Sequence, residues 1–371
     1  MELHLVAKYD KRPKSNENIM TTRLIYPGRY CSLTTLNRIL KGPKYQNAKF
    51  FIFLDENTYN NCLPLLISQV SALEQAEFME VPVGEEAKCI EIASQLWSAL
   101  MESGADRNSL IVNLGGGCVS DIGGFVAAGF KRGIRYINVP TTLIGMVDAA
   151  IGGKTAVNLE GVKNQIGFFH LPEITCIEPR FIDTLPDKEL RSGLCEMLKT
   201  LALANPEQYA QMIAEITMGH VPLSNDIIKE CATIKDSVVR QDPTDLGIRK
   251  ILNFGHTFGH AIEAHAATSV PLTHGEAVAL GMWCAIYLST KKLGLHSEVL
   301  AQYTDALKSL TKIPRYNLRD TERLLAYMRQ DKKNADNLIL CVLLQQIGAP
   351  VIDVPVDENE IRDTLLNLGK I

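Results

Sequence analysis

A buried strand that runs directly into three glycines and then into a helix constrains the fold of this chain more than any other feature. Residues 110–114 form a mainly apolar run, glycines follow at 115–117, and a helix-compatible segment continues to Ala128. Similar strand-like runs occupy residues 49–54 and 135–139, and residues 89–102 have helical periodicity. Strands that alternate with helices predict a parallel sheet joined by crossover helices.

After about residue 180 the pattern changes to long helix-like stretches. They cover residues 187–204, 206–218, 224–241, 257–267 and 275–292. The last stretch has clear end signals, because Thr273 and Glu276 fit a capping box and two lysines precede Gly294. We therefore predict an α/β part over residues 1–179 and a mainly helical part over residues 180–371, with a boundary near Pro179.

The overall composition argues against several classes of protein. The 371 residues carry 38 Lys and Arg against 42 Asp and Glu, a net charge of −4, so we expect no nucleic-acid partner. The longest apolar run, residues 277–288, is shorter than the ~20 residues that span a bilayer, so we expect no membrane partner. The first twenty residues lack a signal-peptide core, and the nine cysteines include no C-x-x-C pair. We expect a cytoplasmic protein with reduced thiols.

Two glycine-containing segments are candidates for binding an anion. The glycines at 115–117 end a strand and begin a helix, where backbone N–H groups favour a phosphate, although the spacing fits a simple tight turn equally well. The glycines before Lys154 would let its ammonium approach an anionic group, and a solvated loop over residues 148–164 is the equal alternative. Thr141 and Thr142 follow a strand, so their hydroxyls would contact a cofactor or cap the next helix.

A cluster of acid, lysine and histidine gives the strongest chemical signal. Four of the eight histidines fall between residues 256 and 274, and His256 and His260 share a helix face at a spacing of four. Catalytic zinc sites take three ligands of the His and Glu type, and Glu196 and His274 are further candidates. Surface histidines or hydrogen-bonded core histidines are the alternative. The pattern is not H-E-x-x-H, and no G-x-S-x-G is present, so protease and esterase interpretations have little support.

Taken together, these segments resemble the 3-dehydroquinate synthases, a family of sugar phosphate cyclases. The matching motifs, spread over roughly residues 50–350, are GEEAK at 84–88, GGGCVSD at 115–121, RG at 132–133, PTTL at 140–143, GGKT at 152–155, KNQIG at 163–167, TLP at 184–186, EMLK at 196–199, RKILNFGHTFGHAIE at 249–263, HGEAV at 274–278 and DKKN at 331–334. The run at 249–263 together with His274 is the most specific of them.

The resemblance implies an N-terminal Rossmann-like NAD-binding α/β domain, a helical C-terminal domain that binds metal and substrate, and a homodimer. It implies that zinc or cobalt is held by Glu196, His256 and His274. It implies that NAD lies against Asp55, Asn57, Glu85, Lys88, Gly115, Gly116, Gly117, Asp121, Thr141, Thr142 and Lys163. It places the sugar-phosphate substrate near Arg132, Asp148, Lys154, Asn164, Lys199, Lys235, Arg249, Asn253, His260 and Lys332.

The family is a group of carbon–oxygen lyases of the shikimate pathway, which supplies aromatic amino acids. The implied reaction converts 3-deoxy-D-arabino-heptulosonate 7-phosphate into 3-dehydroquinate and phosphate. NAD transiently oxidises the C5 hydroxyl, phosphate leaves by β-elimination, the hydride returns, and an intramolecular aldol step closes the ring. His260, one turn from His256, is expected to relay a proton without binding metal. An anion with a carboxylate and a phosphate accounts for the many lysines and arginines.

Three other interpretations stay open. One is a sugar phosphate cyclase that acts on another sugar; the valiolone-type cyclases usually carry a proline where this chain has His260, which favours the dehydroquinate reaction here. The second is a metal-dependent alcohol or glycerol dehydrogenase, which would produce net NADH. The third is a catalytically silent NAD- or metal-binding protein, which the cluster of acid, lysine and histidine disfavours.

Overall fold

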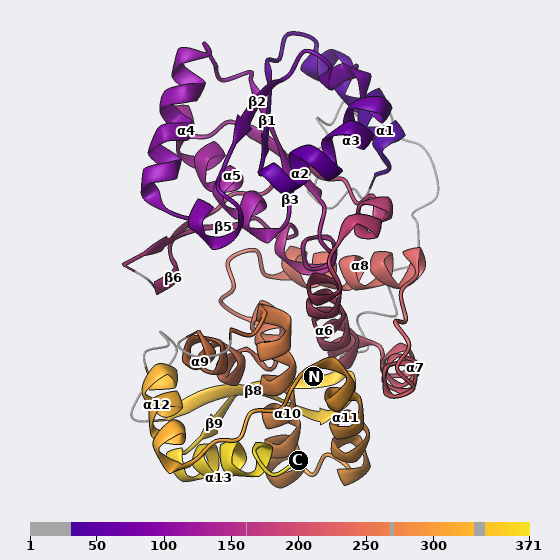
Figure 1. Ribbon diagram of the computed structural model, residues 1–371, viewed down its shortest axis with the longest axis vertical. Coiled ribbons are helices and arrows are strands. Elements are labelled where there is room, and N and C mark those ends of the chain that lie inside the picture. The colour runs from indigo at the N-terminus through magenta and orange to yellow at the C-terminus, as the bar shows by residue number, and fades with distance from the viewer. Residues whose placement is uncertain (1–30, 161, 268–270, 330–337) are drawn as a thin grey trace, which may run out of the picture.

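The computed structural model describes residues 31–160, 162–267, 271–329 and 338–371. Figure 1 shows two parts, one built around a parallel sheet and one built mainly of helices, with β5, β6, α6 and α8 lying between them. Among the described residues, no helix is both long enough and apolar enough to cross a membrane.

A five-stranded parallel sheet forms the centre of the first part. Its order is β2–β1–β3–β4–β7, and every neighbouring pair is parallel. The strands are β1 (Phe50–Leu54), β2 (Glu77–Glu80), β3 (Leu110–Gly115), β4 (Arg135–Pro140) and β7 (Ile174–Thr175). The three predicted strands and their parallel pairing are confirmed, whereas the two short outer strands were not expected.

Helices cover both faces of this sheet because both faces are apolar. Alternate residues of each central strand enter two separate buried clusters, so that Ile52 and Val112 face one side while Phe51 and Ile111 face the other. The helices of this part are α1 (Leu33–Leu40), α2 (Glu56–Asn61), α3 (Leu63–Gln69), α4 (Ile90–Glu102) and α5 (Gly117–Gly129). The expected helix after the three glycines is α5, which starts at the carboxyl end of β3.

An antiparallel hairpin replaces the loop that was one interpretation of residues 148–164. A π-helical turn at Gly145–Ala149 precedes strand β5 (Lys154–Leu159), which pairs with β6 (Val162–Phe169). Val157 of β5 is buried against the apolar cluster under α5, whereas every residue of β6 is exposed. The solvated-loop interpretation is therefore wrong, because one strand of the segment has a buried face.

The second part is mainly helical, as predicted. The five predicted helices are α6 (Asp187–Ala204), α7 (Pro206–Thr217), α8 (Asn225–Gln241), α9 (His256–Ala266) and α10 (His274–Lys292). The capping box of Thr273 and Glu276 is present. The unexpected elements are α11 (Ser297–Leu310), α12 (Leu318–Arg329), β8 (Ile339–Gln346), β9 (Ala349–Val356) and α13 (Glu358–Leu368). The antiparallel β8–β9 pair adds a small sheet to this part.

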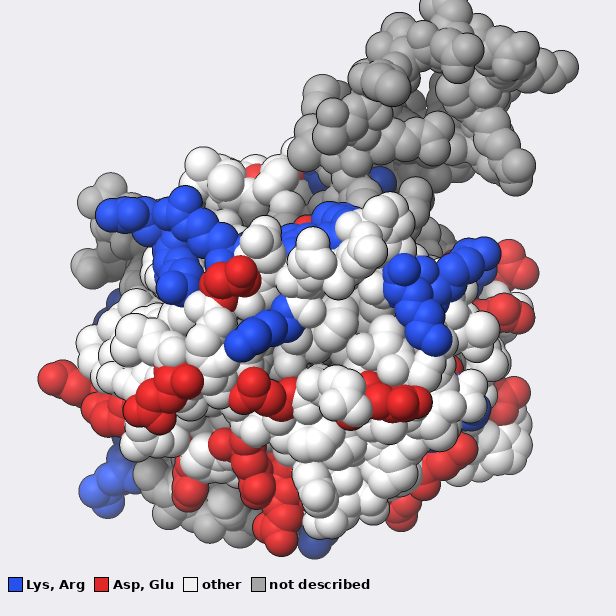
Figure 2. Space-filling model, turned by 90° about the horizontal axis from the view of Figure 1, so that it is seen from above, with Lys and Arg blue, Asp and Glu red and all other residues white. Residues whose placement is uncertain are grey.

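Charge is distributed unevenly over the face shown in Figure 2. Lysine and arginine side chains gather toward one side of that view, and aspartate and glutamate side chains gather toward the other. Both signs of charge are thus present on this face, which is the end of the molecule that carries the parallel sheet.

Candidate active site

Three helices that carry the predicted metal ligands meet without intervening side chains. A Cβ at Gly275, the residue after His274, would lie 2.1 Å from the carbonyl oxygen of Ser192 on α6. A Cβ at Gly281 would lie 2.0 Å from the carbonyl oxygen of Gly255, which precedes α9 in a left-handed conformation with φ of 79°. Because glycine allows these backbone contacts, α10 packs directly against α6 and the start of α9.

The predicted ligands Glu196, His256 and His274 converge at this junction. Glu196 is fully buried, and its Oε1 lies 3.7 Å from Nε2 of His256 and 3.4 Å from Nε2 of His274. Neither carboxylate oxygen has a well-aligned hydrogen bond with any residue that the structure describes. Buried carboxylates normally have such partners, and this donor set is one that zinc and cobalt favour. The residues therefore fit a divalent metal.

The second ring nitrogen of each ligand histidine also has a partner. Nδ1 of His256 lies 3.2 Å from the carbonyl oxygen of Phe254, and Nδ1 of His274 lies 3.1 Å from Oε2 of Glu263. A histidine that donates from Nδ1 presents the lone pair of Nε2, and in both residues Nε2 faces Glu196. Both rings therefore have the orientation that a metal ligand requires.

The pKa values of His256 and His274 are shifted in opposite directions. Burial, followed by the Lys199 charge, lowers the pKa of His256 well below its usual value, so the ring is neutral. Burial alone would also lower the pKa of His274, but its close contacts with the Glu196 and Glu263 carboxylates raise it to about 10. Burial would raise the pKa of Glu196, but Lys199 and the histidines hold it well below its usual range. Metal binding would accordingly displace a proton from His274.

His260 lies beside the ligand pair. Its ring centroid is 5.2 Å from that of His256 and 5.8 Å from that of His274, and one nitrogen of each of the three rings lies within 4.8 Å of the others. Sequence reasoning assigned this histidine to proton relay. The geometry brings it close enough to serve there. It also makes the three histidines an alternative ligand group, in line with the shared helix face of His256 and His260.

A buried ion network adjoins the ligands. Nζ of Lys199 lies 2.7 Å from Oε2 of Glu196 and 3.5 Å from Oδ2 of Asp148, and Lys235 pairs with the same aspartate. Burial would raise the pKa of Asp148, but the two lysines hold it at about 2. Burial, with the nearby positive charges of Lys199 and Arg249, lowers the pKa of Lys235 to about 8 despite its pairing with Asp148. Two ammonium groups thus face two carboxylates, Asp148 and Glu196, and a divalent metal held by Glu196 would give this cluster the net positive charge that suits an anion.

The remaining predicted substrate residues border this network. Buried Arg249 donates from Nη2 to the carbonyl oxygen of Gly152, 3.0 Å away, which holds the turn before Lys154. Lys154 pairs with Asp245 at 2.5 Å. Asn253 donates to the carbonyl oxygen of Lys250, 3.1 Å away, within the turn that leads to α9.

Several of the predicted cofactor residues lie at the carboxyl ends of β3 and β4. Lys88 donates to Asp121 on α5 and to Asn164 on β6, each at 2.7 Å. A Cβ at Gly116 would lie 2.8 Å from Cγ2 of Thr142, so the glycine turn has no room for a side chain beside that threonine. Bare backbone at a helix N-terminus fits a pyrophosphate, as the family resemblance implied.

Further predicted cofactor residues follow the carboxyl ends of β1 and β4. Buried Asp55 caps α2, and Asn57 is exposed in the first turn of that helix. Thr141 is buried and donates its backbone N–H to Gly115, 3.0 Å away. Arg132 follows the far end of the 13-residue helix α5, about 20 Å from the glycine turn. Lys332 lies outside the described residues.

Two functional neighbours escaped sequence reasoning. Asp245 has φ of 62° and pairs with Lys154, although the two residues are 91 positions apart. Glu263 contacts His274 from the end of the motif at 249–263, and its spacing of seven from His256 places both residues on one face of α9. That spacing was the signal available for Glu263, whereas nothing in the sequence links Asp245 to Lys154.

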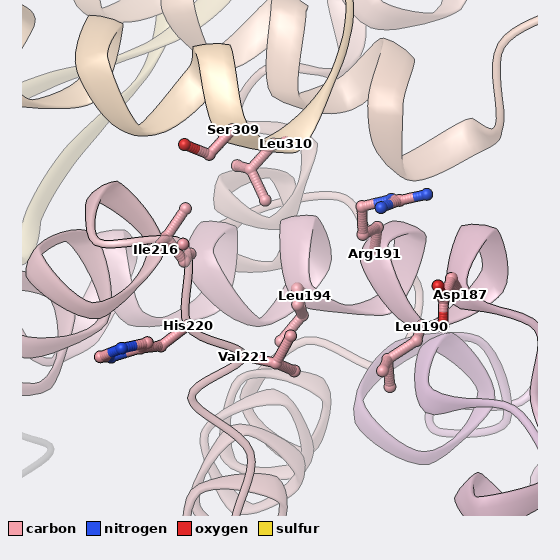
Figure 3. A pocket seen from close by; sticks show the side chains of 10 residues that line it. Asp187, Leu190, Arg191, Leu194, Ile216, His220, Val221, Ser309 and Leu310 are labelled. Atoms are coloured by element: carbon pink, nitrogen blue, oxygen red, sulfur yellow. The ribbon is translucent and has the colours of Figure 1, made fainter.

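A separate hollow lies between α6, α7 and α11 (Figure 3). Leu190, Leu194, Ile216 and Leu310 contribute much of its lining, together with Asp187, Arg191 and His220. None of the predicted metal, cofactor or substrate residues lines it. The chemistry therefore belongs to the junction of the two parts, where the titratable groups converge, and not to this hollow.

Comparisons with known proteins match both parts of the chain to one family. Residues 78–192 match the family described as 3-dehydroquinate synthase N-terminal, and residues 193–334 match 3-dehydroquinate synthase C-terminal. A 3-dehydroquinate synthase of Parabacteroides distasonis is 39% identical over 332 residues, which cover 89% of this chain and 93% of that protein.

Two solved structures show the same fold. One is 2-deoxy-scyllo-inosose synthase complexed with carbaglucose-6-phosphate, NAD+ and Co2+, with a TM-score of 0.79 at 24% identity over 90% of this chain and 94% of that one. The other is 2-epi-5-epi-valiolone synthase from Streptomyces hygroscopicus subsp. jinggangensis 5008 with NAD+ and Zn2+ bound, with a TM-score of 0.77 at 24% identity over 97% and 99% of the two chains.

Proposed function

Because the chain belongs to the 3-dehydroquinate synthase family, we propose that it converts 3-deoxy-D-arabino-heptulosonate 7-phosphate into 3-dehydroquinate and phosphate in the shikimate pathway. The observation that carries this proposal is the convergence of Glu196, His256 and His274 beside the ion network of Lys199, Asp148 and Lys235. It joins a metal site to a site for an anion. A dehydrogenase acting on a neutral alcohol would have no use for the second.

In this proposal, separate groups of residues serve the metal, the cofactor and the substrate. Glu196, His256 and His274 would hold zinc or cobalt, and the glycine turn with Lys88, Glu85 and Lys163 would hold NAD. When bound, the metal polarises a substrate hydroxyl and NAD accepts and returns a hydride. Lys154 and Asn164 orient the phosphate, Lys199, Lys235 and Arg249 hold the carboxylate and hydroxyl groups, and His260 moves a proton at the reacting hydroxyl.

The proposed oligomeric state and cellular location are those that the family resemblance implies. The proposed enzyme is a cytoplasmic homodimer whose chain divides near Pro179 into a cofactor part and a metal and substrate part. The exposed edge strand β6, with Phe168 and Phe169 each about half exposed, supports contact with a second chain. Nine free cysteines are consistent with a reducing compartment.

Substrate choice provides the direct test of the function. The purified protein, loaded with NAD and Zn2+, is expected to release phosphate from 3-deoxy-D-arabino-heptulosonate 7-phosphate without accumulation of NADH. Sedoheptulose 7-phosphate should be turned over at least about 10-fold more slowly, because its missing carboxylate leaves a buried cation unpaired. Phosphate release and absorbance at 340 nm measure both points. Preference for sedoheptulose 7-phosphate would indicate another cyclase, and stoichiometric NADH would indicate a dehydrogenase.

Substrate affinity is expected to depend on the charge of Lys235. Burial lowers its pKa to about 8, so the ammonium is charged at pH 7 and largely neutral at pH 9. An anionic substrate binds the charged form, so KM should rise by about 10-fold between these pH values. The Lys235→Met variant should have a high KM at pH 7 and a flat profile above it. A profile that still rises in the variant would assign the titration to another group.

A further inference from the structure

A chain of polar contacts links the metal ligand His274 to the hairpin of the first part. Nδ1 of His274 lies 3.1 Å from Oε2 of Glu263, whose Oε1 accepts a hydrogen bond from Lys163 at 2.7 Å. Lys163 belongs to β6 and also lies 3.7 Å from Oε1 of Glu85. Oε2 of Glu85 in turn accepts a hydrogen bond from Asn158 of β5 at 2.9 Å. Glu263 is therefore the single residue in this path that contacts both a metal ligand and the cofactor side.

Each carboxylate oxygen of Glu263 has a polar partner in this arrangement. The carboxylate is 15% exposed, and its two oxygens contact Nζ of Lys163 and Nδ1 of His274. A carboxylate that accepts from Nδ1 fixes the histidine tautomer, fixes the ring plane and makes Nε2 more basic. His274 needs this support because it is the first residue of α10 and its side chain is 36% exposed, so helix packing alone does not hold its ring.

The competing interpretation is a simple ion pair between the two parts of the chain. The Lys163 side chain is half exposed, and an exposed pair contributes little to stability. Such a pair would change neither metal affinity nor the dependence of metal affinity on NAD. The two interpretations therefore differ in measurable properties other than stability.

We propose that Glu263 is a positioning residue that holds His274 for the metal and, through Lys163, couples NAD binding to metal binding. This inference rests on the ligand set and cofactor site of the proposed function. Coupling between two sites is reciprocal, so NAD that orders Lys163 against Glu263 tightens metal binding, and metal tightens NAD binding by the same factor.

The test measures Zn2+ affinity of the metal-free full-length protein by competition with a chromogenic chelator, with and without NAD. In the wild type, NAD should tighten Zn2+ binding by at least about 5-fold. Glu263→Ala should weaken Zn2+ binding by about 10- to 100-fold. Glu263→Gln retains an acceptor for Nδ1, so it should restore most of the affinity while losing the response to NAD. Lys163→Met should bind Zn2+ nearly as the wild type does without NAD, but should not respond to NAD.

The exposed carboxylate of Glu86 provides a matched control, since Glu86→Gln should change neither quantity. Circular dichroism establishes that each variant is folded. Unchanged Zn2+ affinity in folded Glu263→Ala would overturn the positioning role, and an intact NAD response in Lys163→Met would overturn the coupling. Failure of the proposed function is distinguishable, because it would appear as absent phosphate release in a wild type whose Zn2+ affinity still depends on Glu263.

Discussion

Replacing His274 with alanine is expected to remove the bound metal and to reduce phosphate release by about 1000-fold or more. The variant loses one of three ligands, and loss of Lewis-acid catalysis worth several kcal/mol corresponds to a rate loss of this size. The fold should survive, because His274 begins a helix whose capping box is made by Thr273 and Glu276. Metal content by atomic absorption and phosphate release by a coupled assay measure the two effects.

The appropriate comparison is His220→Ala, since that histidine is 63% exposed and distant in sequence from the ligands. It should retain full metal content and full activity. His260→Gln should retain metal but lose turnover, in keeping with a proton-transfer role. Full metal occupancy in His274→Ala, combined with loss of metal in His260→Gln, would transfer the ligand assignment to His260.

Replacing Gly116 with valine is expected to weaken NAD binding by at least about 100-fold while leaving Zn2+ binding in place. The residue precedes α5 at the end of β3, where a pyrophosphate would approach the backbone. Even a Cβ there would come within 2.8 Å of Thr142, so the larger side chain has no space on that side. Fluorescence titration with NADH measures the loss.

A graded pair of variants separates two causes of that loss. Gly116→Ala adds only the atom that meets Thr142, and combining it with Thr142→Ser removes the methyl group it meets. If the cofactor is blocked directly, the double variant should remain as weak as Gly116→Ala. Recovery of NAD affinity in the double variant would show that displacement of Thr142 caused the loss. Unchanged NAD affinity in Gly116→Val would show that the glycine turn is not part of the cofactor site.

The elements predicted from the sequence are those with a strong local signal. Strand β1 is a continuous apolar run, and α10 carries a capping box at its start. The hairpin β5–β6 has no such signal, because β6 is exposed along its whole length and so shows no alternation of buried and exposed residues. Strand β2 was missed because only one of its four residues is buried.

The residues of the site likewise differ in whether a local sequence pattern could predict their contacts. His256 and His260 could be paired from their spacing on one helix, since both lie on α9. The approach of Glu196 to His274 depends on tertiary packing of α6 against α10, so residue type made both of them candidate ligands and the family resemblance then joined them with His256 as one ligand set. The contact between Lys154 and Asp245 joins a hairpin to a loop 91 residues away, so no local pattern reports it.

The backbone contacts of Gly275 and Gly281 limit how this protein can diverge through mutation. Gly281 lies about two helical turns from His274, yet a single methyl group there would force α10 away from the residue that precedes His256. A substitution that touches no ligand would thus alter the spacing between two ligands. Directed evolution toward another metal or another sugar would have to conserve these glycines. The substitutions would instead have to fall on side chains that surround the three helices.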